Sequence, residues 1–442
     1  MRLPGTFRTR LALAVVAGLV VRVAYVLVAA RKIAPIGDAV TYHEWARTIA
    51  AGTGWVHIPH AEIGQFQVDP TPSAEHPPLF SLALAGLWKL GVHGYTAQKL
   101  WMCLTGASTV GLIGLAGREA AGERVGVIAA AVAAVYPLLW VADGSLLSET
   151  LYGPFLAGAM LAALRFARRP QLRTGALLGA LVGLAALTRG EALLLAPALL
   201  VPLAFLAPRR RLLNAAVMLA AMAVVIAPWT IRNLSKFNDP VLISTNSNAT
   251  FAGANCHGTY HGDSLGLWRL DCYAGGPRGD ESEQASFYRK RGLDYASDHA
   301  GRLPVVLGAR VGRVWDLYRP RQAVAYEFIE GRSRWASRFG LLAYWPTLVL
   351  AAYGAVVLRR RRAPVLPLVA FPVMVTLVAL IYYGITRFRF AAEPALIVLA
   401  AVALDELLAR RAKRRAGEGE EEQRDGGHLP VPVDPGVHEP AG

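Results

Sequence analysis

Charged side chains are scarce in this sequence. Only 17% of its 442 residues are Asp, Glu, Lys or Arg, whereas 54% are hydrophobic, and the mean hydropathy is positive. Such a composition excludes an ordinary soluble globular protein and favours a polytopic membrane protein. The sequence also lacks a solenoid-like repeat period, which excludes a stacked repeat array.

Long apolar stretches, by contrast, are abundant. A bilayer core about 30 Å thick requires about 20 mostly apolar residues in a helix. Segments of this kind recur at 11–30, 96–116, 125–142, 149–166, 174–188, 191–207, 212–229, 338–358, 364–384 and 394–409. We expect 11–30 to be the first span rather than a cleaved signal, because it lacks a small-residue cleavage site. The pattern predicts an all-α integral membrane protein with about ten transmembrane helices.

The basic residues are concentrated in six clusters, and the net charge is +15. These clusters lie at 2–10, 118–124, 165–173, 209–211, 359–362 and 410–415. With the N-terminus inside and ten spans, all six fall on the cytoplasmic side, as the positive-inside rule expects. No soluble domain with a basic face is evident, so the composition excludes nucleic acid as a partner.

This topology divides the chain into four predicted parts. They are an N-terminal transmembrane module (1–230), an extracytoplasmic insert that forms a small outer loop domain (231–336), the C-terminal transmembrane helices (337–410) and a disordered cytoplasmic tail (416–442). The insert is rich in aromatics, glycines and mixed charge, whereas the tail is acidic and rich in proline.

The first outer loop, about 31–95, contains two short apolar segments. Ala39–Ala51 has helical character and ends before Gly52, a suitable C-cap. The stretch "EHPPLFSLALAGLWKLG" begins with two prolines that suit a first helical turn, and its apolar part is too short to cross a bilayer. We expect both helices to lie along the outer membrane surface and to cover a cavity.

Cysteine is rare, with three residues in the chain. Cys103 lies in an apolar segment, where we expect it to pack. Cys256 and Cys272 both lie in the insert, in a compartment that permits oxidation. A disulfide between them is favoured over two free thiols, although sequence spacing cannot establish its geometry.

Ionisable residues persist at the outer ends of the predicted spans. Such groups are costly near hydrocarbon and usually mark a pathway or a site, although each alone can anchor a helix end. They are Asp38, Glu44, Glu75, His76, Asp143, Glu149, Arg189, Glu191, Arg232, Arg387, Arg389 and Glu393. Acids and arginines at headgroup level suit a phosphate-bearing lipid and a proton-accepting base.

Six stretches, taken in order, resemble the GT-C superfamily of membrane glycosyltransferases. The resemblance is to the branch of the dolichyl-phosphate-mannose protein mannosyltransferases and bacterial aminoarabinose transferases, and it covers about residues 10–405. The stretches are "GDAVTYHEWA", "EHPPLFSLALAGLWKLG", "LLSETLYGPFLAGAMLAAL", "LTRGEALLLAPALL", "APWTIRNLSKFNDPVLISTNSNATFAGAN" and "YYGITRFRFAAEP". It implies a polyprenyl-phosphate sugar donor, with Asp38 as catalytic base on the extracytoplasmic side of the cell membrane.

The other site residues follow from this expectation. Arg387 and Arg389, two apart, are predicted to reach one lipid phosphate because arginine presents a planar set of donors to phosphate oxygens. Secondary phosphate-binding candidates are Arg232 and Arg189. Candidates for substrate or metal binding are Glu75, His76 and Glu149.

Three features refine this interpretation. Glu75 and His76 could ligate Zn or Mn or form a structural pair, so a divalent metal is an open expectation. His257 and His261 are four apart, but the glycines around them favour a loop over a metal site. The protein mannosyltransferases carry an adjacent Asp-Glu pair in the first loop, whereas Ala39 follows Asp38 here, which argues against protein O-mannosylation.

The leading hypothesis is an inverting glycosyltransferase that modifies an unidentified extracytoplasmic acceptor during envelope glycan, lipid or glycoprotein assembly. A lipid-linked-sugar flippase is the alternative, but it should show broken helices and charges at the midplane, and the mid-span residues are mostly Leu, Ala, Val and Gly. A glycan ligase, which transfers a whole glycan from a lipid, fits the same sequence features and stays open. Only six of the 46 basic residues are lysine, which indicates a GC-rich bacterial genome.

Overall fold

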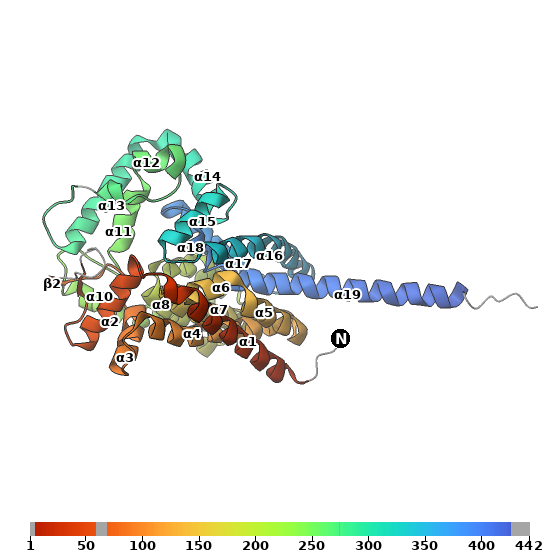
Figure 1. The fold of residues 1–442 in the computed structure, drawn as a ribbon. Helices are drawn as coiled ribbons and strands as arrows, with labels where there is room; N and C mark the ends of the chain where they lie inside the picture. Colours follow the sequence, from red (N-terminus) through yellow and green to blue (C-terminus); the bar gives the residue numbers. More distant parts are fainter. Residues whose placement is uncertain (1–4, 59–68, 274, 426–442) are drawn as a thin grey trace, which may run out of the picture.

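The structure is a computed structural model that describes residues 5–58, 69–273 and 275–425. It is almost entirely helical (Figure 1). The elements up to residue 234 are α1 (Phe7–Val28), η1 (Ala30–Lys32), α2 (Asp38–Ala50), β1 (Val56–His57), β2 (Asp69–Pro72), α3 (Leu79–Lys89), α4 (Tyr95–Ala121), α5 (Glu123–Val135), α6 (Pro137–Asp143), α7 (Glu149–Arg168), α8 (Leu172–Thr188), η2 (Gly190–Leu194), η3 (Ala196–Leu200), α9 (Val201–Leu206) and α10 (Arg211–Leu234).

The remaining elements begin after a short connection. They are α11 (Asn246–Ala254), α12 (His257–Tyr260), η4 (Gly262–Ser264), η5 (Leu270–Tyr273), α13 (Glu281–Asp298), η6 (Ala300–Arg302), α14 (Leu303–Val314), α15 (Pro320–Ile329), α16 (Arg334–Arg360), α17 (Leu366–Ile381), α18 (Thr386–Arg389) and α19 (Glu393–Asp425). The two short strands pair antiparallel, with Val56 opposite Pro72.

All ten apolar segments form helices, but they are not ten uniform spans. Among the described residues, five helices are long and apolar enough to cross a membrane, or six if the bent pair α5 and α6 counts as one. The five are α1 with η1, α4, α7, α10 and α16. The chain is therefore a multi-pass membrane protein, but the expected number of ten spans is not confirmed.

Proline explains two of the irregular segments. Tyr136 has extended backbone because Pro137 disfavours a helical residue before it, and α5 and α6 meet there at an angle of 53°. Pro197 and Pro202 lie in the segment 190–206, which passes through a 3₁₀ turn and a π turn before α9 begins. A proline lacks the N–H that a regular helix needs, so these segments are shorter or bent.

Small residues allow the long helices to approach closely. In the centre of the bundle, α4 packs against α1, α5 and α7, while α8 packs against α10 and α16 packs against α19. A Cβ atom on Gly179 would lie 2.0 Å from the Met218 carbonyl oxygen, and one on Gly354 would lie 1.9 Å from that of Leu399. Helix backbones in contact of this kind are typical of membrane bundles, where small residues replace bulky ones at the interface.

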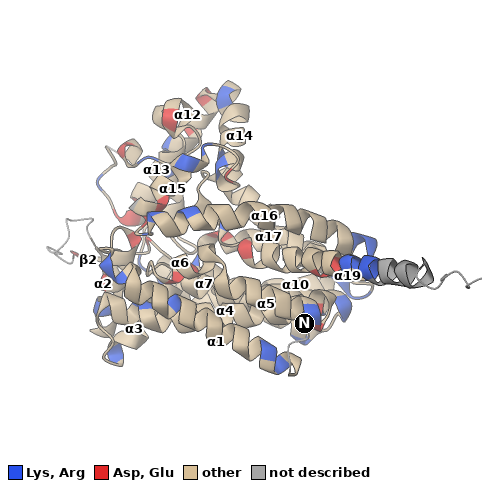
Figure 2. Ribbon diagram, turned by 45° about the vertical axis from the view of Figure 1, so that its right-hand side comes forward, with Lys and Arg blue, Asp and Glu red and all other residues tan. Residues whose placement is uncertain are grey.

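Basic side chains mark one end of the bundle. Figure 2 shows Lys and Arg at the end of α16, on α19 beyond its apolar part and near the N-terminus. Ion pairs at this end include Arg118 with Glu123 and Arg124 with Asp405. The other end carries both acids and arginines, among them the pair Asp38 and Arg387, and the expectation that the basic end is cytoplasmic stays a prediction.

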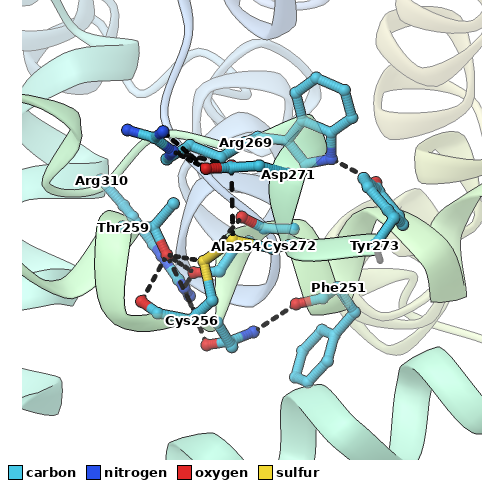
Figure 3. Close-up of a disulfide and its surroundings, with 12 residues drawn as sticks. Phe251, Ala254, Cys256, Thr259, Arg269, Asp271, Cys272, Tyr273 and Arg310 are labelled. Carbon is cyan, nitrogen blue, oxygen red and sulfur yellow. Dashed lines mark hydrogen bonds and ion pairs between the residues drawn. A yellow bond between two sulfur atoms is a disulfide. The ribbon is translucent and has the colours of Figure 1, made fainter. Parts of the chain in front are cut away.

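The segment between α10 and α16 is folded into α11 to α15, which stand beside one end of the bundle (Figure 1). Cys256 and Cys272 form the predicted disulfide, with Cα atoms 6.3 Å apart. Figure 3 shows that bond beside Arg310, which donates to the Ala254 carbonyl at 2.6 Å and joins α14 to α11. Because α14 also packs against α17 and α18, this segment contacts the helical bundle directly.

The two short helices of the first loop form as predicted, as α2 and α3, and they pack against each other. Their position on the membrane surface stays a prediction. The predicted tail behaves differently, because α19 continues as a helix to Asp425. Glu, Gln and Arg in 416–425 favour helix. The rest of the predicted disordered tail, 426–442, lies outside the described residues.

Candidate active site

Asp38 is the first residue of α2, and the residue before it explains its position. Gly37 has φ +54° and ψ −131°, a conformation that other residues rarely adopt, and it turns the chain into the helix. A carboxylate in the first turn is stabilised by the helix dipole. The Asp38 side chain is 30% exposed, so it remains open to a ligand.

Glu149 is the first residue of α7 and follows a strained turn. Leu146, three positions earlier, has φ +54°, which is uncommon for a residue other than glycine. This turn connects α6 to α7 and places the Glu149 carboxylate inside the protein, where its side chain is 1% exposed. Strained backbone of this kind often accompanies a functional site.

Arg387 lies in the four-residue helix α18, between α17 and α19. Gly384 makes this turn possible, because a Cβ atom there would lie 2.1 Å from the Arg310 carbonyl oxygen. The chain can therefore pass close to α14 and then reverse toward α19. This path directs the Arg387 side chain at residues from the first loop.

Arg387 joins carboxylates from three distant parts of the chain. Its Nη1 donates to Asp38 Oδ2 at 2.9 Å and to Glu330 Oε2 at 2.6 Å. Its Nε donates to Glu149. Asp38 and Arg387 are 349 positions apart. We call this group, with the ion-pair partners described next, the Arg387 cluster.

Two further arginines complete the cluster. Arg189 Nη1 lies 3.1 Å from Glu149 Oε1, and Arg189 Nε lies 2.5 Å from Glu191 Oε1. Arg332 Nη2 lies 3.4 Å from Glu149 Oε1, and its Nη1 pairs with Glu327. Three arginines thus meet five carboxylates in one continuous network.

Sequence reasoning missed Glu327, Glu330 and Arg332. They lie in "YEFIEGRSRW", within the polar insert, where charged residues do not stand out. A signal existed, however, because this stretch directly precedes the apolar segment 338–358. The predicted topology therefore places it on the same side of the membrane as Asp38. Reading the flanks of every span, including the polar ones, would have found them.

The pKa values of Asp38 and Glu330, the two partly exposed acids of the cluster, shift in opposite directions. Burial alone would raise the pKa of Asp38, but the positive charge of Arg387, followed by that of His76, holds this pKa well below its usual range. Burial raises the pKa of Glu330 above its ordinary value, although Arg387 opposes the shift and Asp38 adds to it. Asp38 is therefore ionised at neutral pH, as a proton acceptor must be.

His76 and Glu75 border the Arg387 cluster. His76 Nε2 lies 3.6 Å from Asp38 Oδ1 and 3.9 Å from Glu75 Oε1, and the His76 ring packs against Tyr42. Among the described residues, no group of three or more His, Cys, Asp and Glu side chains is arranged to hold a metal ion. The expectation of a divalent metal therefore stays open, and we derive no step through a metal.

Arg389 does not share the Arg387 cluster. Its Nη1 lies 2.5 Å from Asp316 Oδ2, its Nε lies 2.7 Å from Glu393 Oε1, and its side chain is completely buried. The Glu393 carboxylate also accepts a hydrogen bond from Tyr136. This separate Arg389 cluster corrects the expectation that both arginines reach one phosphate, because residues two apart on a helix point in nearly opposite directions.

Arg232 is also outside the Arg387 cluster. It donates to the Ser73 carbonyl at 2.9 Å and to Asn233 at 2.9 Å, and its guanidinium packs over Trp229. It therefore joins the end of α10 to the first loop. Its contacts thus connect elements of the fold, and it lies apart from Arg387, the proposed phosphate-binding arginine.

The remaining acids identified from sequence have other partners. Glu44 pairs with Arg47 at 2.8 Å on α2, and Asp143 pairs with Arg22 at 2.6 Å inside the bundle. Both lie apart from the Arg387 cluster.

The aromatic residues of α2 pack against neighbouring segments. Trp45 is completely buried and donates to the Val56 carbonyl, while His43 stacks on Tyr95 with ring centroids 3.8 Å apart. Their role is to hold α2 in place, and thereby to support Asp38 at its start.

Comparison with protein families and solved structures places this geometry in context. Residues 75–231 match the family described as dolichyl-phosphate-mannose-protein mannosyltransferase. No curated protein sequence matches the chain. The matched segment begins at Glu75, includes Glu149 and Arg189, and ends near the last residues of α10.

Solved structures of membrane glycosyltransferases are similar in fold. The archaeal oligosaccharyltransferase AglB from Archaeoglobus fulgidus, in complex with an inhibitory peptide and a dolichol-phosphate, has a TM-score of 0.57 at 15% identity, covering 94% of this chain and 52% of that one. The oligosaccharyltransferase of the same organism with Zn and sulfate has a TM-score of 0.55 at 15% identity, covering 92% and 50%. ArnT from Cupriavidus metallidurans, bound to undecaprenyl phosphate, has a TM-score of 0.40 at 15% identity, covering 89% and 76%.

This chain spans about half the length of the archaeal oligosaccharyltransferase. The similarity to AglB shows a shared fold, and the family match over residues 75–231 agrees with the GT-C resemblance of the sequence motifs.

Proposed function

We propose that this chain is an inverting glycosyltransferase that moves a sugar from a polyprenyl-phosphate donor to an acceptor on the extracytoplasmic face of the cell membrane. One observation carries the proposal: Arg387 Nη1 lies 2.9 Å from Asp38 Oδ2. A base beside a guanidinium suited to phosphate provides the two groups that this transfer needs. The matched mannosyltransferase family and the dolichol-phosphate bound by AglB support the same class of donor.

The donor phosphate approaches Arg387, whose own side chain is 8% exposed, from the side of its partly exposed partners. Here Asp38 and Glu330, with side chains 30% and 31% exposed, can yield to an incoming anion. Glu149 is 1% exposed and also bonded to Arg189 and Arg332, so it keeps the inner side of the Arg387 guanidinium in place. The phosphate thus replaces the outer carboxylates while the arginine stays oriented.

Displacement of the ion pair prepares Asp38 for catalysis. Without the bond to Arg387 the Asp38 carboxylate becomes more basic, because that arginine is the main group that lowers its pKa. Asp38 then takes the proton of the acceptor hydroxyl as the hydroxyl oxygen bonds to the anomeric carbon. The bond from that carbon to the phosphate oxygen breaks, and polyprenyl phosphate leaves with the electron pair, its charge stabilised by Arg387.

The test uses the purified full chain, a polyprenyl-phosphate sugar and a panel of envelope acceptors. We expect acceptor-dependent release of polyprenyl phosphate and a product whose anomeric configuration, measured by NMR, is opposite to that of the donor. Retention of configuration would exclude the single displacement proposed here. A ligase that transfers a whole glycan would use the same residues, and the mass of the transferred group distinguishes it.

A lipid-linked-sugar flippase is the second candidate, and two observations favour it. The α5–α6 pair is bent by 53°, and a fully buried Arg22 pairs with Asp143 between these apolar helices. Broken helices and buried charges are typical of transporters. Reconstituted proteoliposomes that move the lipid-linked sugar between leaflets without cleaving it, at an undiminished rate in Asp38→Asn, would support this alternative.

A further inference from the structure

A cavity of about 790 Å³ lies at the basic end of the bundle, and the proposed function does not use it. It is lined by Glu119, Arg165, Arg168, Arg169, Gln171, Arg173, Thr174 and Leu177. These residues come from the end of α4, the end of α7, the start of α8 and the short connection between α7 and α8. Its volume is within the range of cavities that hold small ligands.

The length of α7 separates this cavity from the Arg387 cluster. Glu149 is the first residue of α7 and Arg168 is the last, and the helix has 20 residues. A helix of that length spans about 30 Å, which is about the thickness of the bilayer core. The cavity therefore lies at the headgroup level of the opposite leaflet and is a different site.

The lining of the cavity is strongly positive. It contains four arginines and one acid, Glu119. The Nε atoms of Arg165 and Arg168 are each 3.7 Å from that carboxylate, and their side chains are 54% and 44% exposed. One carboxylate shared at this distance cannot balance the arginines around it, so an anion would find donors that are still accessible.

We propose that this cavity binds the phosphate group of an anionic membrane phospholipid. The argument for a lipid, as opposed to free phosphate, is the apolar part of the wall. Leu177 is 51% exposed, lines the cavity and follows Arg173 by one turn on α8. An acyl chain can thus lie along Leu177 while its phosphate contacts the arginines, an arrangement expected of basic pockets between transmembrane helices.

The plain alternative is that these arginines only orient the helices during membrane insertion. The two hypotheses predict different effects of Glu119 on lipid binding. For a lipid site, Glu119 weakens binding because it competes with the phosphate for Arg165 and Arg168. If the arginines act only in insertion, Glu119 has no effect on any lipid.

Native mass spectrometry of the purified full chain provides the test, with phosphatidylglycerol as the anionic probe, phosphatidylcholine as the neutral one and inorganic phosphate as the soluble one. We expect phosphatidylglycerol to bind in preference to both others. The double variant Arg165→Gln/Arg168→Gln should weaken its binding by about 25-fold, at about 5-fold per arginine, while Glu119→Gln should strengthen it. The control is Arg359→Gln/Arg360→Gln in the last turn of α16, exposed arginines at the same end that do not line the cavity.

Each result decides the proposal. Equal binding of the two phospholipids, equal losses in the cavity variant and the control, or no change in Glu119→Gln would overturn the lipid site. Inorganic phosphate that binds as tightly as phosphatidylglycerol would show that the acyl chain contributes nothing and that the ligand is free phosphate. Opposite effects of the arginine and Glu119 variants cannot arise from misfolding, which would weaken binding in both.

Discussion

Arg387 and Arg389 stand two positions apart in one short helix, and their surroundings differ completely. Arg387 contacts Asp38 and Glu330, whose side chains are 30% and 31% exposed. Arg389 pairs with Asp316 and Glu393, whose side chains are 2% and 1% exposed, and its guanidinium lies 3.5 Å from the ring centre of Tyr344.

Under the proposed function, access to the carboxylate partners, more than residue type, separates a binding arginine from a structural one. Two helical residues with one residue between them point about 200° apart. One side chain therefore faces the first loop and the other faces the protein interior. An incoming phosphate can replace a partly exposed carboxylate, whereas replacing a buried one would require the protein to open.

The largest expected effect concerns Asp38. Asp38→Asn keeps size and polarity but removes proton acceptance, so transfer should fall about 10²- to 10⁴-fold in a steady-state assay. The unfolding temperature should remain near that of the wild type, and donor binding should be no weaker, because Asp38 competes with the phosphate for Arg387. Glu44→Gln is the matched control, because Glu44 pairs with Arg47 away from the cluster. Near-normal turnover in Asp38→Asn together with an inactive Glu75→Gln would assign the base to Glu75 instead.

The Arg389 cluster should respond in stability. Arg389→Met leaves the Asp316 and Glu393 carboxylates buried without their partner. Loss of one member of a buried ion pair costs about 3–5 kcal/mol, and chemical unfolding in detergent should show this decrease. Arg387→Met should cost less, because Glu149 keeps its contacts with Arg189 and Arg332. Equal losses of stability in the two variants would remove the distinction between the clusters.

Arg387 should respond in donor recognition. A charge-assisted hydrogen bond contributes about 1.5–3 kcal/mol, so Arg387→Gln should lower kcat/KM for the polyprenyl donor about 10- to 150-fold. Titration of donor binding with the purified variant provides an independent measurement. A variant that binds and uses the donor as the wild type does would reduce Arg387 to a helix anchor, like Arg389.

The smallest expected effect is a shift in pH dependence. Arg387 lowers the pKa of Asp38, whereas burial raises it. As the pH is lowered, the residual activity of Arg387→Gln should therefore begin to fall at a higher pH than the activity of the wild type. Glu330 is a like charge beside Asp38, so Glu330→Gln should move that limb to a lower pH. Pre-steady-state rates across pH measure both shifts, and shifts of the same sign would contradict the shared ion pair.

Sequence reasoning found the site residues that stand out against an apolar background. Asp38, Glu149, Arg189 and Arg387 each adjoin an apolar segment, where a charge is costly and therefore conspicuous. Glu330 precedes the apolar segment 338–358 but lies in the polar insert, where one more charge is not conspicuous, so its part in the cluster was missed. The grouping of Arg387 with Arg389 was wrong because two adjacent charges were assumed to share one partner.

Hydropathy predicted the positions of the helices more reliably than their lengths and their regularity. All ten apolar segments are helical, since burying backbone in lipid requires internal hydrogen bonds. The break before Pro137 and the non-α turns between Gly190 and Leu200 depend on packing as well as on proline. These turns shorten the helices, so the number of apolar segments does not equal the number of full-length spans.

The sequence by itself determined that this is a helical membrane protein with basic residues gathered at one end, because hydrophobicity and charge act on each segment locally. Only the tertiary structure decided which charges meet. Asp38 and Arg387 are 349 positions apart, and their contact requires α2, α7 and α18 to pack at one point. A charge can be recognised from its own position, but its partner depends on the direction in which each helix carries its side chains.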